Sequence, residues 1–303
     1  MRSPATGLSL VLGRTLLAWS EQVADGGLDR YQALGGFQGL QRAAALTPVE
    51  VIAELRSAGL RDRSGDAEPV YLNWQRFLMR HGRGTMVVDA SELDPRHLAG
   101  AELLGKNPYG LLEALYVAAR ATGASRCLVL LPPQLAGQAA GLLNAAEQVA
   151  ASGLGGGLAL DLEISGDRQP SIMAHPEPPE GLGQCLLHDL ETWYHITLVM
   201  SLGAGWHEAL GVGGHTGTRL VTLLGAVNQP GLVETPMGSD LWQVITALGE
   251  GVKAGVTPLA VAIDGGMGGY LTPPAAQIPL ATEELMAAGV DPGLGSLELL
   301  AEG

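Results

Sequence analysis

The segment between Gly59 and Trp74 carries the residues best suited to bind a ligand. Arg61, Arg63 and the nearby Gly65 are typical of a loop that holds a phosphate group, because backbone N–H groups and guanidinium groups both present positive charge to it. Acidic residues lie in the same segment, at Asp62, Asp66 and Glu68. Each nearby carboxylate opposes an anion by roughly 1 kcal/mol or more. The segment therefore predicts either a nucleotide-binding scaffold that has lost its nucleotide or a polar surface loop.

A pair of histidines offers a second candidate site. Apolar residues at helical spacing predict a helix from Leu186 to Met200. His188 and His195 lie seven residues apart on that helix, with Glu191 nearby. A structural zinc site requires four ligands, and the neighbouring sequence supplies no others. The pattern favours a packed, partly exposed helix face over a metal site.

Two glycine-rich stretches, at 211–217 and 265–269, form a third candidate. The second follows a predicted strand, but Pro273 and Pro274 prevent a helix from beginning after it. An anion site at a helix N-terminus is therefore not expected there, and a tight turn is the better interpretation. Both stretches are flexible enough to approach a ligand or a partner protein.

Composition limits the classes of partner. The chain of 303 residues has 17 Lys and Arg against 31 Asp and Glu, a net charge of −14. Nucleic acids and anionic membranes both favour a basic protein face, so neither is expected as a partner. Only 16% of residues are charged, whereas about 25% is usual. We therefore expect partner subunits to cover part of the surface.

The cysteines and the apolar segments bear on location. Cys127 lies in an apolar run and is predicted to be a core residue. With only Cys185 besides, the chain cannot supply the four thiolates of an iron–sulfur cluster. No segment approaches the ~20 apolar residues of a transmembrane helix, and residues 8–23 are predicted to form an amphipathic helix. The expected location is cytoplasmic, with the periphery of a membrane complex as an alternative.

The elements that must position these residues begin with helices. Residues 31–46 have helical spacing with a break at Gly35 and Gly36, and Thr47, Pro48 and Glu50 form the pattern of a capping box at the start of the next helix. Strands and helices then alternate, which predicts a parallel α/β sheet. The strands are predicted at 85–88, 127–131 and 158–164, and the helices at 108–122 and 135–151.

From residue 203 onward the pattern changes. Strands are predicted at 218–224, 232–235 and 259–263, with a helix at 240–248 that Ser239 would cap. A hairpin, a helix and a further strand within about 55 residues predict a small β-grasp domain. A short helix at 283–288 and an apolar tail at 297–300 end the chain.

From about Tyr31 onward the chain resembles the flavoprotein subunit of the NADH:quinone oxidoreductase (complex I) family and its relatives in hydrogenases and formate dehydrogenases. The resemblance is carried by the segment from Leu46 to Ile52, by Gly59-Leu60-Arg61, by Trp74 and by residues 203–238. It implies a Rossmann-like parallel α/β domain followed by a soluble-ligand-binding (SLBB) β-grasp domain. It also implies sites for FMN and NADH, and a four-cysteine domain that this chain does not reach.

The chain departs from the family pattern at each of these sites. Its flavin loop keeps Arg63, Gly65 and Trp74 but has side chains where the family has glycines, and Asn73 replaces a lysine. Added β-carbons narrow the approach of a phosphate. A second flavin motif is altered at 89–96, a third at 131–134, and the Asn-Asn-Val-Glu-Thr motif is altered at 188–192. The segment with the family's paired glutamates near NADH is missing around 165–169. The resemblance assigns degenerate FMN positions to Arg63, Ser64, Gly65, Asn73, Asp89 and Glu92.

Three functions remain open from the sequence. The first is a non-catalytic, structural or regulatory subunit of an electron-transfer assembly, without catalytic residues, metal or cofactor. The second is an active NADH- or FMN-linked oxidoreductase subunit with a rearranged site, and the third is a small-ligand or protein binding module that uses the β-grasp domain. The expected organisation is a helical extension (1–30), the α/β domain (31–200), the β-grasp domain (201–275) and a tail (276–303). The expected partners are protein subunits of an electron-transfer complex.

Overall fold

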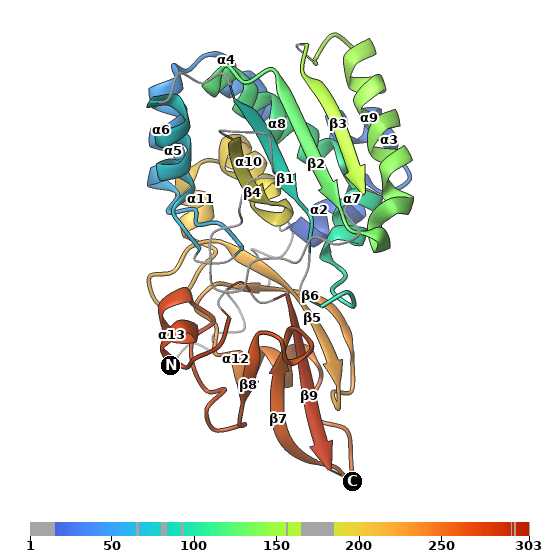
Figure 1. Ribbon diagram of the computed structural model, residues 1–303, viewed down its shortest axis with the longest axis vertical. Coiled ribbons are helices and arrows are strands. Elements are labelled where there is room, and N and C mark those ends of the chain that lie inside the picture. The colour runs from blue at the N-terminus through green and yellow to red at the C-terminus, as the bar shows by residue number, and fades with distance from the viewer. Residues whose placement is uncertain are drawn as a thin grey trace.

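The computed structural model describes residues 16–64, 67–79, 84–91, 94–155, 157–164, 185–291, 293 and 295–302. Figure 1 shows two sheets stacked end to end along the long axis, each with its own helices. The first sheet is parallel throughout, in the order β3-β2-β1-β4. The α/β class with a second sheet is therefore confirmed. Its strands are β1 (Thr85–Asp89), β2 (Arg126–Leu131), β3 (Ala159–Ile164) and β4 (Cys185–Asp189).

Two buried helices form the centre of the first domain. In α10 (Leu190–Leu202) every residue from Leu190 to Met200 is buried, and α8 (Pro108–Thr122) is buried along most of its length. Both are almost without charge, as expected for helices surrounded by protein. The other helices of this domain are α5 (Pro48–Ser57), α6 (Val70–Met79), α7 (Ala99–Lys106), the 3₁₀ helix η2 (Pro133–Gln138), α9 (Ala139–Ala151) and α11 (Ala204–Glu208).

Local sequence signals place several helix ends as predicted. Thr47 and Glu50 form the reciprocal capping box at the start of α5. The predicted break at Gly35 and Gly36 separates α3 (Gly27–Ala33) from α4 (Gln38–Ala44). The predicted N-terminal helix is described only from Leu16, as α2 (Leu16–Val23), and residues 8–15 lie outside the described part. The Glu234 carboxylate accepts hydrogen bonds from the backbone N–H groups of Leu16 and Leu17, which ties α2 to the second domain.

The prediction of one helix from Leu186 to Met200 is wrong at its start. Residues 185–189 form β4, which pairs with β1 in parallel, and α10 begins only at Leu190. The cause is a tertiary contact. The edge of β1 offers backbone hydrogen-bond partners to residues 185–189, and the local sequence propensity gives no information about such partners. His188 therefore lies on a strand and His195 on a helix, so the two do not share a helix face.

The second sheet has the order β6-β5-β9-β7-β8. Its strands are β5 (Thr218–Gly225), β6 (Gly231–Pro236), β7 (Thr257–Ile263), β8 (Gly269–Leu271) and β9 (Ser296–Glu302), and its short helical segments are α12 (Leu241–Gln243), the π-helical η3 (Val244–Leu248), η4 (Asp264–Gly266) and α13 (Thr282–Ala287). Asp240, not Ser239, caps α12, because its carboxylate accepts from the N–H of Gln243. The apolar end of the chain is the central strand β9, parallel to β5 and antiparallel to β7.

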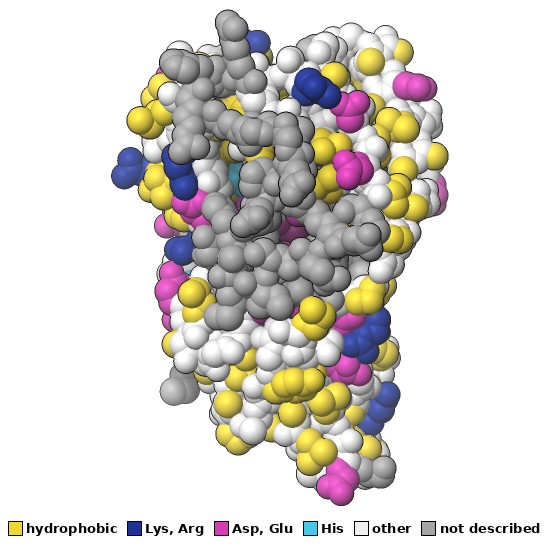
Figure 2. Space-filling view, viewed as in Figure 1, with side chains coloured by type: hydrophobic (Ala, Val, Ile, Leu, Met, Phe, Trp, Pro, Cys, Tyr) yellow, Lys and Arg dark blue, Asp and Glu magenta, His cyan; other side chains and the backbone are white. Residues whose placement is uncertain are grey.

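The surface carries few basic groups. On the face shown in Figure 2, the described Lys and Arg side chains are scattered, and hydrophobic side chains lie on both domains. Large apolar side chains that stay exposed include Val49 (74%), Met79 (80%) and Tyr270 (59%). Among the described residues no helix has both the length and the hydropathy that a membrane span requires.

Candidate functional site

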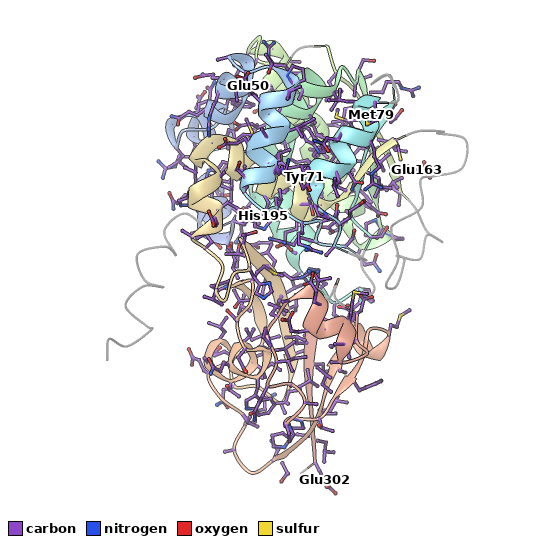
Figure 3. All side chains as sticks on the ribbon, turned by 90° about the vertical axis from the view of Figure 1, so that its left-hand side faces the viewer. Glu50, Tyr71, Met79, Glu163, His195 and Glu302 are labelled. Carbon is purple, nitrogen blue, oxygen red and sulfur yellow. The ribbon has the colours of Figure 1, made fainter. Side chains whose placement is uncertain are left out.

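The candidate site lies at the carboxyl end of the parallel sheet, where α/β folds usually bind their ligands. Asp89 and Asp189 are paired in register at the ends of β1 and β4. The chain from Gly59 to Ser64 passes this edge, and the N-terminus of α10 begins there. Figure 3 shows His195 on the side of the first domain that faces the second. The site is therefore enclosed between the two domains.

Asp62, His188 and Trp74 form a buried, hydrogen-bonded cluster beside this edge of the sheet. The Trp74 indole N–H donates to His188 Nε2 at 3.2 Å. Because an indole only donates, Nε2 must carry the lone pair and the proton must lie on Nδ1. His188 Nδ1 then donates to Asp62 Oδ2 at 2.5 Å. Asp62 and His188 are buried, so a neutral imidazole holds a buried carboxylate in place.

Asp62 remains charged despite its burial. Burial alone would raise the pKa of its carboxyl group, but the hydrogen bonds from His188 and Ser64 hold that pKa below its ordinary value. The Ser64 N–H and hydroxyl both donate to Asp62 Oδ1, at 3.0 and 2.7 Å. The loop thus places a fixed negative charge where a phosphate-binding loop needs positive partial charge.

The N-terminus of α10 is already occupied by a side chain of the protein itself. Asp189 Oδ1 accepts from the backbone N–H groups of Glu191 and Thr192, at 2.8 and 3.2 Å. The hydroxyl of Thr192 accepts from the N–H of Arg63 at 2.8 Å. Free N–H groups at a helix start are what bind a phosphate, and here these donors and this hydroxyl are engaged within the chain.

Two buried arginines balance the carboxylates and join the domains. Arg219 on β5 donates from Nη2 to the backbone oxygen of Arg63 at 2.6 Å. Glu191 Oε1 accepts from the N–H of Leu220 at 3.0 Å. Burial raises the pKa of Glu191, and the charges of Arg219 and Arg63 oppose that rise. Burial lowers the pKa of Arg63 to about 10. Arg63 and Glu191, which the sequence assigned to altered family motifs, therefore form hydrogen bonds to β5 of the second domain.

The segment from Asp94 to Leu98 also contacts the second domain. Asp94 Oδ2 accepts from the hydroxyl of Ser296 at 2.7 Å, and Arg96 bridges Asp94 and Glu298, both at 2.9 Å. The hydroxyl of Thr222 accepts from the N–H of Leu98 at 3.0 Å. The contacts reach both β5 and β9, so the interface involves the centre of the second sheet.

The structure brings together only some of the predicted flavin positions. Arg63 and Ser64 lie in the buried network described above. Asn73 is half-buried on α6, and Asp89 ends β1 with its carboxylate accepting from the N–H of Ser91 at 3.0 Å. Gly65 and Glu92 lie outside the described residues. The sequence did not by itself assign His188, Asp189, Glu191 or Arg219 to this site, although the altered motif at 188–192 was the available signal.

The histidines of this region are buried, so the predicted partly exposed helix face is wrong. His195 Nε2 lies 3.4 Å from Glu191 Oε1, and its ring contacts that of His207 with centroids 5.4 Å apart. Burial lowers the pKa of both histidines well below its ordinary value, which leaves them neutral. Within the described part of the chain, no group of three or more His, Cys, Asp and Glu residues could hold a metal ion.

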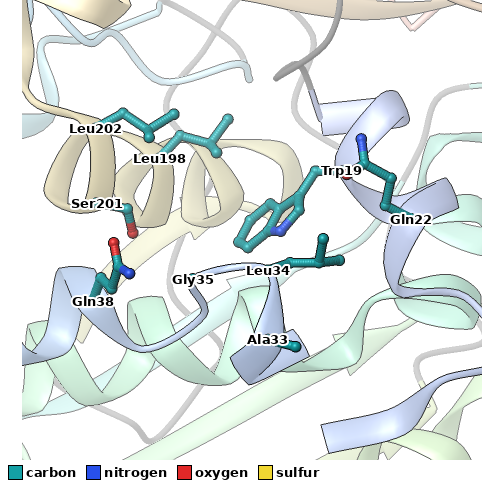
Figure 4. A pocket seen from close by; sticks show the side chains of 9 residues that line it. All are labelled: Trp19, Gln22, Ala33, Leu34, Gly35, Gln38, Leu198, Ser201 and Leu202. Carbon is teal, nitrogen blue, oxygen red and sulfur yellow. The ribbon is translucent and has the colours of Figure 1, made fainter. Parts of the chain in front are cut away.

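A separate cleft of about 500 Å³ lies among α2, the turn before α4, and the end of α10. Figure 4 shows the indole of Trp19 between Leu34 and Leu198, and the side chains of Gln38 and Ser201 pointing toward each other. Among the described residues that line the cleft, none is charged. None of its described lining residues is among the predicted flavin positions.

Asp189 gives the site a pH dependence that can be tested. Burial, with added repulsion from Asp62 and Glu191, raises the pKa of Asp189 from 3.8 to about 8. The contribution of Asp189 to the free energy of unfolding is therefore full below about pH 4 and is lost as the pH rises toward 8. Asparagine cannot ionise and is an equally good N-cap. We expect Asp189→Asn to gain stability relative to the wild type between pH 4 and 8, by at most roughly 1.4 kcal/mol per pH unit.

Urea denaturation at pH 5, 6, 7 and 8 measures this difference. Asp161→Asn is the matched control, because Asp161 is exposed and its ion pair among the described residues is with the exposed Arg126. The control is expected to show no pH trend. A constant difference between Asp189→Asn and the wild type would contradict the assignment.

Comparison with known proteins confirms the resemblance seen in the sequence. The chain is 28% identical to the NADP-reducing hydrogenase protein HndC of Solidesulfovibrio fructosivorans, over 91% of this chain and 62% of that protein. It is 27% identical to the F-type subunit of NADH-quinone oxidoreductase of Streptomyces coelicolor, over 81% and 61%. The NAD⁺-reducing [NiFe]-hydrogenase structure matches with a TM-score of 0.70 at 22% identity, over 99% of this chain and 51% of that one. The chain thus spans about three fifths of these curated relatives. No family model matches it.

Proposed function

We propose that this chain is a non-catalytic subunit of an electron-transfer assembly. The proposal proceeds from its similarity to HndC and to the F-type subunit of NADH-quinone oxidoreductase. The names of these relatives support the part of the proposal that places the chain in an electron-transfer assembly. The residues at the candidate site support the absence of flavin chemistry, because they do not fit a phosphorylated flavin. The chain would keep the fold as a structural or regulatory component.

The observation that carries this proposal is the buried carboxylate of Asp62. It is held by His188 and Ser64 at the loop where the family places glycine. A phosphate brought close to it would experience repulsion in a region of reduced dielectric, where charges interact more strongly than in water. Asp189 adds a second obstacle, since its side chain already caps α10.

Flavin binding tests the proposal directly. Protein purified without refolding is expected to show no flavin absorbance, and titration with FMN or NADH is expected to give dissociation constants weaker than about 1 mM. This limit corresponds to less than about 4 kcal/mol of binding free energy. A curated relative purified in the same way is the positive control. Stoichiometric FMN in the chain would overturn the proposal in favour of an active subunit with a rearranged site.

The expected partners are other protein subunits. The small share of charged residues, 16%, and the exposed side chains of Val49, Met79 and Tyr270 support a surface that is partly covered in the assembly. Affinity purification from the source cells is expected to recover electron-transfer subunits in fixed ratio. Recovery of the chain alone, at its native concentration, would count against this part of the proposal.

A further inference from the structure

A second cavity lies between the two domains, on the side of the loop that faces the β-grasp-like domain. Its volume is about 180 Å³. Its walls come from the start of the loop, from the glycine-rich stretch before β5 and from α13, and they include Arg61, Arg63, His215, Thr216 and Glu283. In a chain with only 17 Lys and Arg residues, the meeting of two arginines and a histidine at one cavity is a strong local concentration of basic groups.

Arg63 has unused hydrogen-bonding capacity. The side chain is only 4% exposed, and Nη1 donates to the backbone oxygen of Arg61 at 3.3 Å. Nε and Nη2 are buried and have no hydrogen-bond partner within the part of the chain that the structure describes. Buried donors are nearly always paired, and an unpaired buried charge is especially costly. The guanidinium group is therefore suited to an acceptor from outside the chain.

Arg61 and Glu283 stand nearer the solvent. Arg61 Nη2 lies 3.3 Å from Glu283 Oε1, and these side chains are 41% and 64% exposed. Exposed ion pairs of this kind contribute little stability, so the Glu283 carboxylate can be displaced by another anion. Arg61 is also held through Nε, which donates to the backbone oxygen of Ala67 at 2.9 Å.

We propose that this cavity binds a small tetrahedral oxyanion of the phosphate type, held by Arg63 and Arg61 with Glu283 as the competing internal anion. Arginine is suited to such anions because its planar group donates two parallel hydrogen bonds. At roughly 30 Å³ per water molecule, the volume of the cavity equals that of a few water molecules. That is below the range of about 300–1,000 Å³ for larger ligands, so a phosphate group fits and a flavin or nucleotide ring does not.

The cavity shares Arg63 with the predicted flavin positions, and its other described lining residues are not among them. It lies against Thr216, Met237 and α13 of the second domain. Because both domains line the cavity, a bound anion would strengthen their contact. Anion binding here does not depend on the proposed non-catalytic role, and FMN binding and phosphate binding are measured separately.

Thermal unfolding at constant ionic strength tests the site. Inorganic phosphate and sulfate, in place of chloride, are expected to raise the midpoint of unfolding in a saturable way. Arg63→Met is expected to weaken phosphate binding about tenfold or more, because it removes the buried cation. Glu283→Gln is expected to tighten phosphate binding roughly fivefold, since it removes one opposing charge near the site.

Two controls keep the result interpretable. Glu302→Gln removes an exposed carboxylate at the end of β9 and is expected to leave phosphate affinity unchanged. If Arg63→Met does not fold, Glu283→Gln against Glu302→Gln still decides the question. Glycerol phosphate distinguishes the source of the anion, since its binding would indicate the phosphate group of a larger ligand and its exclusion would indicate the free anion. No saturable effect of phosphate and sulfate, or equal effects in Glu283→Gln and Glu302→Gln, would overturn the inference.

Discussion

Replacing Asp62 by alanine is expected to lower the free energy of unfolding by about 3–5 kcal/mol. The substitution leaves the Nδ1–H of His188 and the N–H of Ser64 without their acceptor, and each unpaired buried donor costs about 1–3 kcal/mol. His188 cannot recover by moving its proton, because Trp74 needs Nε2 as an acceptor. Chemical denaturation at pH 7 measures the loss.

The pH dependence and two further variants sharpen this prediction. The pKa of Asp62 is held below its ordinary value of 3.8, so its contribution is full above about pH 4 and is lost as the pH falls through the lower, folded-state pKa. Asp62→Asn is expected to lower the free energy of unfolding less than Asp62→Ala does, because the amide oxygen of asparagine still accepts hydrogen bonds from Ser64. Asp161→Ala, at an exposed ion pair, is the control and is expected to cost less than about 1 kcal/mol. A loss for Asp62→Ala as small as the control's would show that the carboxylate does not hold the loop.

Replacing Arg219 by methionine is expected to loosen the contact between the domains and to cost about 3–5 kcal/mol. The variant loses the hydrogen bond to the backbone oxygen of Arg63. It also removes a positive charge that opposes the rise in the pKa of Glu191 and of Asp189. Methionine preserves most of the apolar contact area, so the loss reports mainly on the charge.

Hydrogen exchange locates the effect of this change. Faster exchange is expected at the N–H of Leu220, which donates to Glu191, and along the segment from Asp94 to Leu98 that contacts β5 and β9. Lys253→Met is the matched control in the second domain, since Lys253 is exposed and its hydrogen bond within the described chain goes to the backbone oxygen of Gly225. Unchanged exchange at the interface in Arg219→Met would mean that Arg219 does not join the domains.

The two substitutions address the same question from opposite sides. Asp62 anchors the loop within the first domain through His188, and Arg219 reaches the same loop from the second domain. If both cost several kcal/mol, the altered flavin residues contribute to the stability of the fold. That result would support the proposal that the chain keeps the scaffold for assembly and not for redox chemistry.

Local features of the fold were determined by the sequence itself. The capping box at Thr47 and Glu50, the helix from Pro108 to Thr122 and the strand around Cys127 depend on neighbours within a few residues. Short-range backbone hydrogen bonds and hydrophobic spacing suffice for such elements. The acidic character of the loop at Asp62 was equally plain, because charge is a property of the residues alone.

The tertiary structure alone decided which residues meet. Residues 185–189 became a strand because β1 offered an open edge, and residues 296–302 became the centre of the second sheet because β5 and β7 lie on either side. The partnership of Asp62 with His188 spans 126 positions, and that of Arg219 with Arg63 spans 156. Contacts this distant in sequence depend on how the whole chain packs. The sequence could therefore indicate a loop rich in charged residues, but only the folded chain showed that these residues hold the two domains together.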